Sequence, residues 1–233
     1  MVGNALMTSS LPFVPQRGDM TSYSESLFPE SDVIAQARAR GQEFGIPNTE
    51  QLVGSLIRYL AELIGASAVV EVGTGTGVSG LYLLGLPHLT LTSIDAEMAH
   101  AKAARLAFDE AEISPTRYRL ITGATKEVIG KLADNSYDIF VMRQTRDSGD
   151  SDYLVDALGH AERSLRPGGL LILDSVLGGG KVADPTQRDD QSIARREVIR
   201  AIRASNNWRP LLLPLADGVL VATKSLAMEG MSK

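Results

Sequence analysis

A glycine-rich segment at residues 69–80 constrains the fold more than any other part of this chain. Its sequence is Val-Val-Glu-Val-Gly-Thr-Gly-Thr-Gly-Val-Ser-Gly, an apolar strand that ends beside a carboxylate and turns through glycines into the start of a helix. Glycine adopts backbone dihedrals that a Cβ resists, and it lets the backbone approach a ligand closely. The free N–H groups at the start of the helix point at whatever lies on the turn. The segment therefore predicts a nucleotide-type pocket.

Short apolar segments and amphipathic helices alternate from residue 68 onward, which is typical of a parallel sheet with helices on both faces. Near the end of the chain, residues 211–222 form two apolar runs around Asp217-Gly218, which predicts a hairpin and hence an antiparallel strand. We therefore expect an α/β fold with a doubly wound, mostly parallel seven-stranded sheet, a C-terminal antiparallel hairpin strand and additional N-terminal helices. The expected strands of the alternating part are 68–72, 90–94, 117–122, 137–142 and 169–174, and the expected helices are 77–84, 97–111, 124–133, 151–165 and 187–205.

The N-terminal part of the chain lies outside this alternating pattern. Residues 1–22 are rich in Ser, Thr, Pro and Gly and predict a disordered arm, and residues 225–233 predict a short tail. Between them we expect N-terminal helices at 23–66 and a core domain at 67–224. Ser31-Asp32 can cap the first helix, which runs to about Phe44, and Asn48 or Thr49 can cap the second. The second helix carries an apolar stripe that predicts core packing, formed by Leu52, Leu56, Ile57, Leu60, Leu63 and Ile64.

The composition excludes several classes of site. The 233-residue chain has no cysteine, which excludes disulfides, zinc–thiolate sites and cysteine nucleophiles, and its three histidines are too scattered for a metal cluster. Its formal net charge of −5 gives no attraction to nucleic acid or to an anionic membrane surface. No apolar run approaches the ~20 residues of a membrane span, and the N-terminus lacks a secretory signal pattern. We therefore expect a cytoplasmic protein that binds neither nucleic acid nor membrane.

Two registers of the glycine motif are open. Gly75-x-Gly77-x-x-Gly80 matches the dinucleotide fingerprint, and Asp95 follows 20 residues after Gly75. The other register, Gly73-x-Gly75-x-Gly77 with a carboxylate two residues before it, is that of enzymes that use S-adenosylmethionine.

Glu71 and the C-terminal hairpin favour the second register. A carboxylate beside the turn would oppose a pyrophosphate, whereas it attracts the ammonium group of S-adenosylmethionine. The hairpin strand is what methyltransferase sheets add to the plain doubly wound sheet. Asp95 fits either register, because a carboxylate after the second strand can accept hydrogen bonds from both ribose hydroxyls. An NAD(P)-dependent reductase is the less favoured alternative.

Longer motifs in the core resemble one family. The motifs at 70–79 and 92–95 (Thr-Ser-Ile-Asp) are shared by many methyltransferases. With the later motifs, the chain resembles the caffeoyl-CoA and catechol O-methyltransferase family, in particular its small bacterial members, from about residue 30 to residue 224. The later motifs are Ser-Tyr-Asp-Ile-Phe-Val at 136–141, Leu-Arg-Pro-Gly-Gly-Leu-Leu-Ile at 165–172, Gly-Gly-Lys-Val-Ala-Asp-Pro at 179–185 and Leu-Leu-Pro-Leu-Ala-Asp-Gly at 212–218.

The resemblance implies a class I, Rossmann-like methyltransferase, with S-adenosylmethionine as methyl donor, S-adenosylhomocysteine as product, a small hydroxylated acceptor and a homodimeric assembly. It also implies that Asp95 holds the ribose, with Ala96 beside the adenine. Thr49 falls where the family closes over the cofactor, and Gly123 and Ala124 fall where family backbone reaches the adenine. By the same resemblance, the turn and the methionine part of the cofactor are contacted by Glu71, Gly73, Thr74, Gly75 and Ser79.

The pattern departs from the family at the ends of two strands. In the family the fourth strand ends in Val-Asp-x-Asp-Lys, and its first Asp binds a divalent metal. Here residues 141–146 are Val-Met-Arg-Gln-Thr-Arg, so Arg143 replaces that Asp and Arg146 replaces the Lys, while Asp174-Ser175 replaces the family's Asp-Asn on the fifth strand. Mg²⁺ needs a compact set of oxygen ligands, and a guanidinium is a fixed positive charge. We therefore predict that the metal is absent and that a salt bridge between Arg143 and Asp174 replaces it.

Without a metal, the acceptor hydroxyl must still be deprotonated or polarised, and the residues leave the base open. The candidates are Asp174 as a base and Arg143 or Arg146 as oxyanion stabilisers. A second hypothesis is a homologue that binds the cofactor but has lost O-methyltransferase activity. Three further carboxylates could in principle restore a metal site, although their pattern favours a solvated loop followed by a helix N-cap: Asp147, Asp150 and Asp152.

Overall fold

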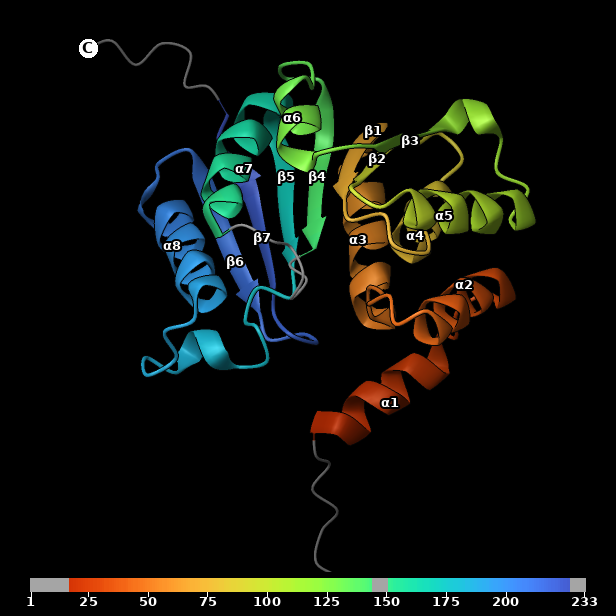
Figure 1. Ribbon diagram of the computed structural model, residues 1–233, viewed down its shortest axis with the longest axis horizontal. Coiled ribbons are helices and arrows are strands. Elements are labelled where there is room, and N and C mark those ends of the chain that lie inside the picture. Colours follow the sequence, from red (N-terminus) through yellow and green to blue (C-terminus); the bar gives the residue numbers. More distant parts are fainter. Residues whose placement is uncertain (1–16, 144–150, 227–233) are drawn as a thin grey trace, which may run out of the picture.

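The computed structural model describes residues 17–143 and 151–226, and seven strands of this part form one sheet (Figure 1). The strands are β1 (Ala68–Val72), β2 (Thr90–Asp95), β3 (Tyr118–Thr122), β4 (Tyr137–Arg143), β5 (Leu165–Asp174), β6 (Trp208–Leu213) and β7 (Val219–Lys224). Their order in the sheet is β3-β2-β1-β4-β5-β7-β6. The first five run parallel, and β7 is antiparallel to both of its neighbours. The predicted sheet with its antiparallel hairpin strand is confirmed.

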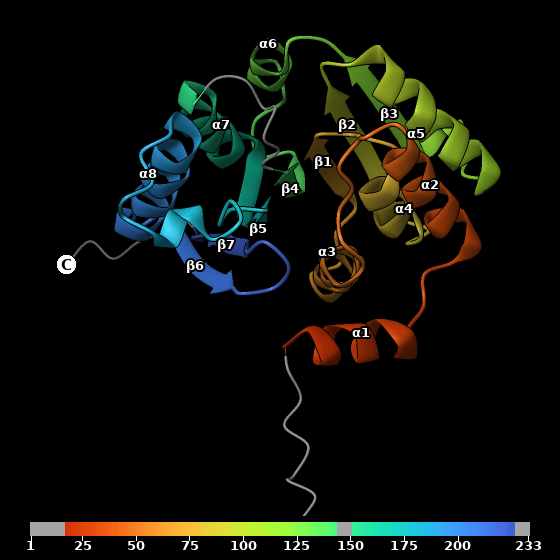
Figure 2. The same ribbon diagram turned by 60° about the horizontal axis from the view of Figure 1, so that its bottom comes forward.

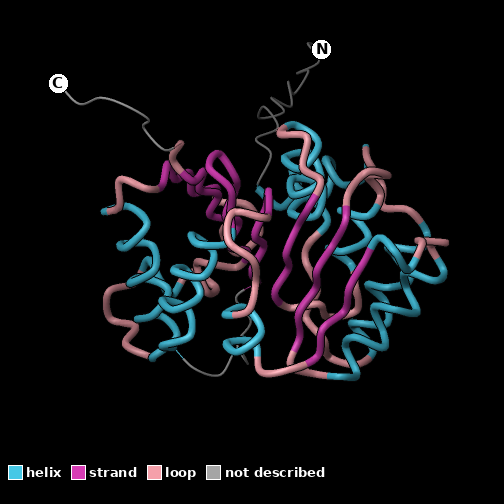
Figure 3. Tube along the Cα trace, turned by 90° about the horizontal axis from the view of Figure 1, so that it is seen from above, coloured by secondary structure: helices cyan, strands magenta, loops and turns pink. Residues whose placement is uncertain are grey.

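Helices cover both faces of the sheet, and Figure 3 shows them on either side of the strands. One face is covered by α3 (Gln51–Leu63), α4 (Val78–Leu84) and α5 (Met98–Glu110), with α2 (Asp32–Glu43) packed on the outside of α4 and α5. The other face is covered by α6 (Thr125–Gly130), α7 (Ser151–Ser164) and α8 (Asp190–Ala204). Two short 3₁₀ turns lie at Pro115–Arg117 and Lys181–Ala183.

The central strands are buried on both faces, which explains why their sequences are nearly continuous apolar runs. Successive side chains point to opposite faces. In β1, Val69 joins the core under α3, α4 and α5, and Val70 joins the core under α6, α7 and α8. In β4, Ile139 likewise joins the first of these cores and Phe140 joins the second.

The predicted N-terminal arm overlaps a helix, α1 (Arg17–Leu27), so the prediction is wrong for residues 17–22, while residues 1–16 lie outside the described part. Met20, Tyr23 and Leu27 recur at helical spacing, a signal that the Ser- and Thr-rich composition obscured. All three side chains are exposed. Helix α1 lies beside α3 and away from the sheet (Figures 1 and 2), and Gln51 of α3 donates hydrogen bonds to the carbonyls of Glu25 and Phe28.

Helix α3 begins one or two residues later than expected, and most of its predicted apolar stripe packs into the core. Its N-cap is Glu50, because Asn48 and Thr49 belong to the preceding loop, where they contact other parts of the site. Ile57 of the predicted stripe is fully buried, and Leu56, Leu60 and Ile64 pack against the same core. Gly54 also lies on the buried face, where a Cβ would be 2.3 Å from the Tyr82 ring. The predicted core packing is therefore confirmed for these four stripe residues, whereas Leu63 is 66% exposed.

Other boundaries differ by a few residues. Helix α6 ends at Gly130, earlier than expected. Strand β5 begins at Leu165 because this residue pairs with Tyr137 before a register shift. The hairpin turn carries Gly218 with φ +85°, at a position where a Cβ would lie 2.4 Å from Leu177. None of the described helices is long and apolar enough to cross a membrane.

Candidate functional site

The predicted site residues come together at the carboxyl edge of the parallel strands. Strands β1 and β4 are neighbours there although they are distant in sequence, and such a switch in strand order opens a crevice for ligands. Gly73 follows β1, Asp95 ends β2, Arg143 ends β4 and Asp174 ends β5. Arg143 and Asp174 are direct register partners.

The glycine turn has the backbone conformation that its sequence predicts. Gly73, Gly75 and Gly77 have φ angles of +97°, +52° and +86°, which L-residues with a Cβ rarely adopt. At Gly77 a Cβ would also lie 3.0 Å from the Cα of Ala104, so this glycine allows the turn to pack on α5. The turn therefore needs glycine both for its dihedral angles and for close packing.

Glu71 is a buried carboxylate beneath this turn. It accepts hydrogen bonds from the hydroxyls of Ser79 and Ser93, the latter at 2.6 Å, and Thr74 Oγ1 lies 2.7 Å from Ser93 Oγ. Burial raises the pKa of Glu71 to about 7, against the opposing effect of the two hydroxyl donors. In the described part of the chain its hydrogen-bond partners are hydroxyls, with no cation among them. A ligand ammonium would supply the missing positive charge and favour the ionised form.

Ser93 is a site residue that sequence reasoning missed. It is fully buried in β2, two residues before Asp95, and it links Thr74 to Glu71. The signal was present, because a serine in an apolar strand needs a hydrogen-bond partner when it is buried.

Asp95 also lies at the turn, and most of its hydrogen-bonding capacity is in use. Its Oδ2 accepts from the backbone N–H of Gly75 at 3.1 Å, and its Oδ1 accepts from the N–H of Glu97 at 2.9 Å. The ring Nδ1 of His100 lies 3.0 Å from the same Oδ1. A carboxylate has about four lone-pair sites, so only about one stays open. Contact with both ribose hydroxyls requires one partner to move, and His100 is the only side chain among the three.

A loop between α2 and α3 lies over the glycine turn. Ile46 and Pro47 approach Gly75, where a Cβ would lie 3.6 and 3.7 Å from them. The buried hydroxyl of Thr76 lies 2.7 Å from both the carbonyl of Ala37 and Oδ1 of Asn48. These contacts join the loop to the turn.

Thr49 belongs to the same loop and is buried. Its carbonyl accepts a hydrogen bond of 2.7 Å from Arg38, which also pairs with Glu30. The hydroxyl of Tyr82 donates to the same Glu30 at 2.7 Å. Sequence reasoning placed Thr49 at the cofactor but missed this Glu30–Arg38–Tyr82 network, whose members are distant in sequence.

The predicted pair of Arg143 and Asp174 is present. Arg143 Nε lies 3.7 Å from Asp174 Oδ2, and the side chains are 16% and 3% exposed. Burial raises the pKa of Asp174, an effect that the Arg143 charge opposes. Burial lowers the pKa of Arg143, opposed by the charges of Asp174 and Glu50. The predicted salt bridge is confirmed, and Glu50 is an additional charged group that sequence reasoning missed.

The remaining predicted positions lie at the same edge. Ala96 is exposed and follows Asp95 directly. The N–H of Gly123 donates a hydrogen bond of 3.0 Å to the carbonyl of Asp95, and Ala124 is the N-cap of α6. Arg146 lies outside the described residues, as do Asp147 and Asp150.

Comparisons with known proteins decide the family of this chain. The sequence profile of the O-methyltransferase family matches residues 25–225. A Mycobacteroides abscessus protein named as an O-methyltransferase is 41% identical over 220 residues, which cover 94% of this chain and 100% of the relative. The chain belongs to the O-methyltransferase family.

Solved structures agree with this membership. A Corynebacterium glutamicum protein has a TM-score of 0.82 and 30% identity, covering 91% of this chain and 98% of that protein. The O-methyltransferase TomG from Streptomyces achromogenes, solved in complex with S-adenosylmethionine, has a TM-score of 0.78 and 22% identity, covering 88% and 96%. At this lower identity, TomG supports the fold.

The described residues beside Asp174 do not fit the divalent metal that the family resemblance implies. No group of three or more His, Cys, Asp or Glu side chains that could hold a metal ion occurs in the described ranges 17–143 and 151–226. The carboxylate of Asp174 faces a guanidinium instead of further oxygen ligands. A divalent cation beside Arg143 would meet like charge.

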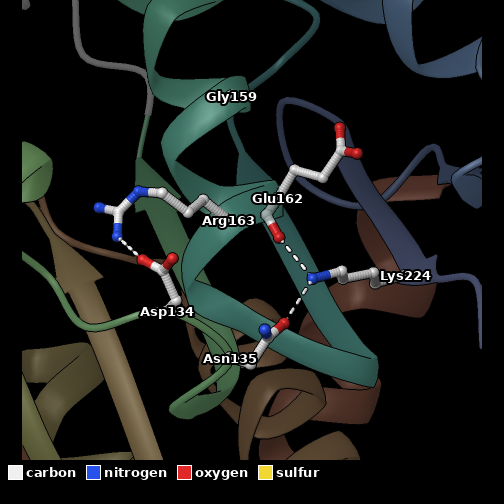
Figure 4. A pocket seen from close by; sticks show the side chains of 6 residues that line it. All are labelled: Asp134, Asn135, Gly159, Glu162, Arg163 and Lys224. Carbon is white, nitrogen blue, oxygen red and sulfur yellow. Dashed lines mark hydrogen bonds and ion pairs between the residues drawn. The ribbon is translucent and has the colours of Figure 1, made fainter. Parts of the chain in front are cut away.

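A separate surface pocket lies at the opposite, amino edge of the sheet (Figure 4). There, Lys224 Nζ donates to Asn135 Oδ1 at 3.0 Å and to the carbonyls of Glu162 and Leu165, each at 2.6 Å. Arg163 pairs with Asp134. The charged side chains of this pocket thus have partners within the protein. In this O-methyltransferase these contacts connect α7, β7 and the turn before β4.

Proposed function

We propose that this protein transfers the methyl group of S-adenosylmethionine to a hydroxyl of a small-molecule acceptor, without a divalent metal. The observation that carries the proposal is the buried carboxylate of Glu71 beneath the glycine turn, held by hydroxyls and raised in pKa to about 7. The ammonium group of S-adenosylmethionine is the charge that this environment lacks.

The rest of the cofactor fits the same edge of the sheet. In this proposal Asp95 accepts a hydrogen bond from the ribose, and Ala96, Gly123 and Ala124 border the adenine. The loop that carries Thr49 covers the glycine turn, and it excludes water from the reacting atoms. When bound, S-adenosylmethionine supplies an activated methyl group, so the protein has to position the acceptor and remove its proton.

In this proposal Arg143 and Asp174 perform the two functions that a metal would otherwise serve at the acceptor oxygen. The guanidinium stabilises negative charge that develops on the acceptor oxygen, and the carboxylate takes the proton. Support comes from their position, because Arg143 lies beside Gly73 at the turn and a Cβ on Gly73 would be 3.8 Å from Cβ of Arg143.

The cofactor part is tested by titration calorimetry with S-adenosylhomocysteine. We expect binding, and we expect no competition by NADH. The methyl-transfer part is tested with tritiated S-adenosylmethionine and a panel of hydroxylated acceptors, with EDTA or with added Mg²⁺. We expect the same rate in both conditions, whereas loss of activity in EDTA would contradict the metal-free proposal. Tight cofactor binding without transfer to any acceptor would support an inactive homologue instead.

We also propose that the protein is a homodimer that joins through α1 and α3. Exposed apolar side chains on these helices support this assembly, among them Tyr23, Tyr59 and Leu63. Light scattering after gel filtration tests it. We expect a dimer for the wild type and a monomer for a variant that combines Tyr59→Glu with Leu63→Glu. The control is Leu106→Glu, at an exposed leucine on α5. A monomeric wild type would contradict the assembly.

A further inference from the structure

Two polar contacts of the loop between α2 and α3 converge on Arg38 of α2. The side-chain amide of Asn48 donates a hydrogen bond of 3.2 Å to the backbone carbonyl of Arg38. The guanidinium Nη1 of Arg38 donates to the carbonyl of Thr49 at 2.7 Å. We call residues 46–49 the cover loop, because a Cβ on Gly75 of the glycine turn would lie 3.7 Å from its backbone. Arg38 therefore holds the loop that lies over the turn.

The carboxylate of Glu30 orients the guanidinium of Arg38. Nε of Arg38 donates to Glu30 Oε2 at 2.8 Å, and Nη2 donates to Oε1, so both carboxylate oxygens are engaged. A bidentate pair of this kind fixes the geometry of the guanidinium in addition to its energy. The side chains of Arg38 and Glu30 are 20% and 8% exposed, so solvent screens them less than a surface ion pair. With two nitrogens held by Glu30, the third nitrogen points at the carbonyl of Thr49.

Tyr82 connects this pair to α4, the helix that begins directly after the glycine turn. Its hydroxyl donates a hydrogen bond of 2.7 Å to Glu30 Oε1. The tyrosine is buried, and its ring lies so close to α3 that a Cβ on Gly54 would be 2.3 Å away. Burial tends to raise the pKa of Glu30, but the hydrogen bonds from Arg38 and Tyr82 outweigh this effect and lower it. Glu30 is therefore an ionised group fixed between α2 and α4.

The contact to a loop distinguishes this network from an ordinary connection between helices. Arg40 provides the comparison, because it lies on the same helix, is 19% exposed and pairs with Glu110 of α5. That pair joins two helices. The network of Arg38 instead extends from α4 to a loop carbonyl at the predicted cofactor site.

We propose that Glu30, Arg38 and Tyr82 are positioning residues that hold the cover loop closed and thereby set the rate at which the cofactor leaves. The inference rests on the proposed function, because it requires the cofactor to lie at the glycine turn beneath this loop. Surface loops open locally at a lower free energy than the core of a protein. Each contact that fixes the closed loop lowers the population of the open form, and a ligand beneath the loop dissociates from the open form.

Arg38→Met tests the network, because methionine keeps an unbranched apolar stem and has no donor for Glu30 or Thr49. Surface plasmon resonance on the immobilised protein measures the dissociation rate of S-adenosylhomocysteine. We expect dissociation to be about 10-fold faster or more, the effect of losing hydrogen bonds from a charged group. Hydrogen exchange of the peptide that contains the cover loop is also expected to be faster in the ligand-free variant.

Arg40→Met is the matched control, because it removes an ion pair of similar exposure from the same helix. We expect this variant to be less stable in urea, with a wild-type dissociation rate and wild-type exchange of the cover loop. A merely structural role for Arg38 predicts something different. In that case dissociation would follow the loss of stability and would be equally fast in two variants of equal stability.

Two further variants test the inference if Arg38→Met does not fold. Tyr82→Phe removes one hydroxyl from the network, and we expect dissociation of S-adenosylhomocysteine to be a few-fold faster. Glu30→Gln combined with Arg38→Met leaves no buried charge without its partner. We expect this double variant to release S-adenosylhomocysteine about 10-fold faster or more, because the hydrogen bond to the carbonyl of Thr49 is lost.

Two results would overturn the inference and leave the proposed function standing. The first is a wild-type dissociation rate in folded variants that lack the guanidinium of Arg38. The second is an equal acceleration by Arg40→Met. A wild type that does not bind S-adenosylhomocysteine would instead overturn the proposed function together with this inference, and the wild-type measurement alone distinguishes that outcome.

Discussion

Glu71 gives the sharpest prediction, because replacing it with glutamine is expected to change stability and cofactor affinity in opposite directions. Burial raises the pKa of Glu71 from 4.5 to about 7 in the folded protein. Between these values the folded state keeps a proton that the unfolded state has lost. Stability therefore falls as pH rises through this range.

The size of the effect follows from the shift. A change from 4.5 to about 7 is about 2.5 pKa units. At 1.36 kcal/mol per unit, burial of this carboxylate lowers the unfolding free energy above pH 7 by about 3 kcal/mol relative to acidic pH. Glutamine resembles the protonated side chain and has no charge to bury. Above pH 7 we therefore expect Glu71→Gln to be more stable than the wild type, by up to about 3 kcal/mol.

Cofactor binding is expected to change in the other direction. An ammonium group favours ionised Glu71, so binding of S-adenosylhomocysteine near pH 6 is expected to release up to about one proton. Affinity of the wild type is then expected to rise as pH increases toward 7. Glu71→Gln is expected to bind more weakly above pH 7 and to lose this pH dependence.

Urea unfolding at a series of pH values measures the first effect, and calorimetry in buffers of different ionisation enthalpy measures the proton release. The control is Glu62→Gln, an exposed carboxylate on α3. Identical pH profiles of stability for wild type and Glu71→Gln would refute the reasoning about burial. Equal affinity for S-adenosylhomocysteine above pH 7 would refute the role of Glu71 toward the ammonium.

Three further predictions concern the same edge of the sheet. Asp95→Ala is expected to weaken S-adenosylhomocysteine binding by about 2–4 kcal/mol in calorimetry, because it removes a charged acceptor; an unchanged affinity would exclude the ribose contact. Gly77→Ala is expected to lower the unfolding free energy by about 1–3 kcal/mol in urea, since its φ is +86° and a Cβ would lie 3.0 Å from Ala104 Cα; wild-type stability would show that the turn can relax. Arg143→Asp combined with Ser175→Asn is expected to create Mg²⁺ affinity, and a titration without binding would mean that these are not the lost ligand positions.

Local patterns predicted most of the fold. Apolar strands next to amphipathic helices indicated the doubly wound sheet, and Asp217-Gly218 indicated the hairpin, because turn chemistry and periodicity depend on neighbours in sequence. Helix α1 was missed since Met20, Tyr23 and Leu27 lie among polar residues and bury little surface. The cap of α3 was misplaced because Asn48 has a tertiary partner, Thr76.

The sequence alone determined the glycine turn, the carboxylates at positions 71 and 95, and the presence of Arg143 where the family has a metal ligand. The turn and the carboxylates follow from residue type and spacing along the chain, and the position of Arg143 follows from the family resemblance. Only the tertiary structure decided that Ser93 donates a hydrogen bond to Glu71 and that His100 contacts Asp95. It also decided that Oδ2 of Asp174 has no hydrogen-bond partner among the described residues. These features depend on which side chains from separate strands meet after folding, and on how much burial each one undergoes. That is the physical reason why motifs indicated the methyl donor, whereas the contacts at the ends of β2, β4 and β5 were decided by the folded structure.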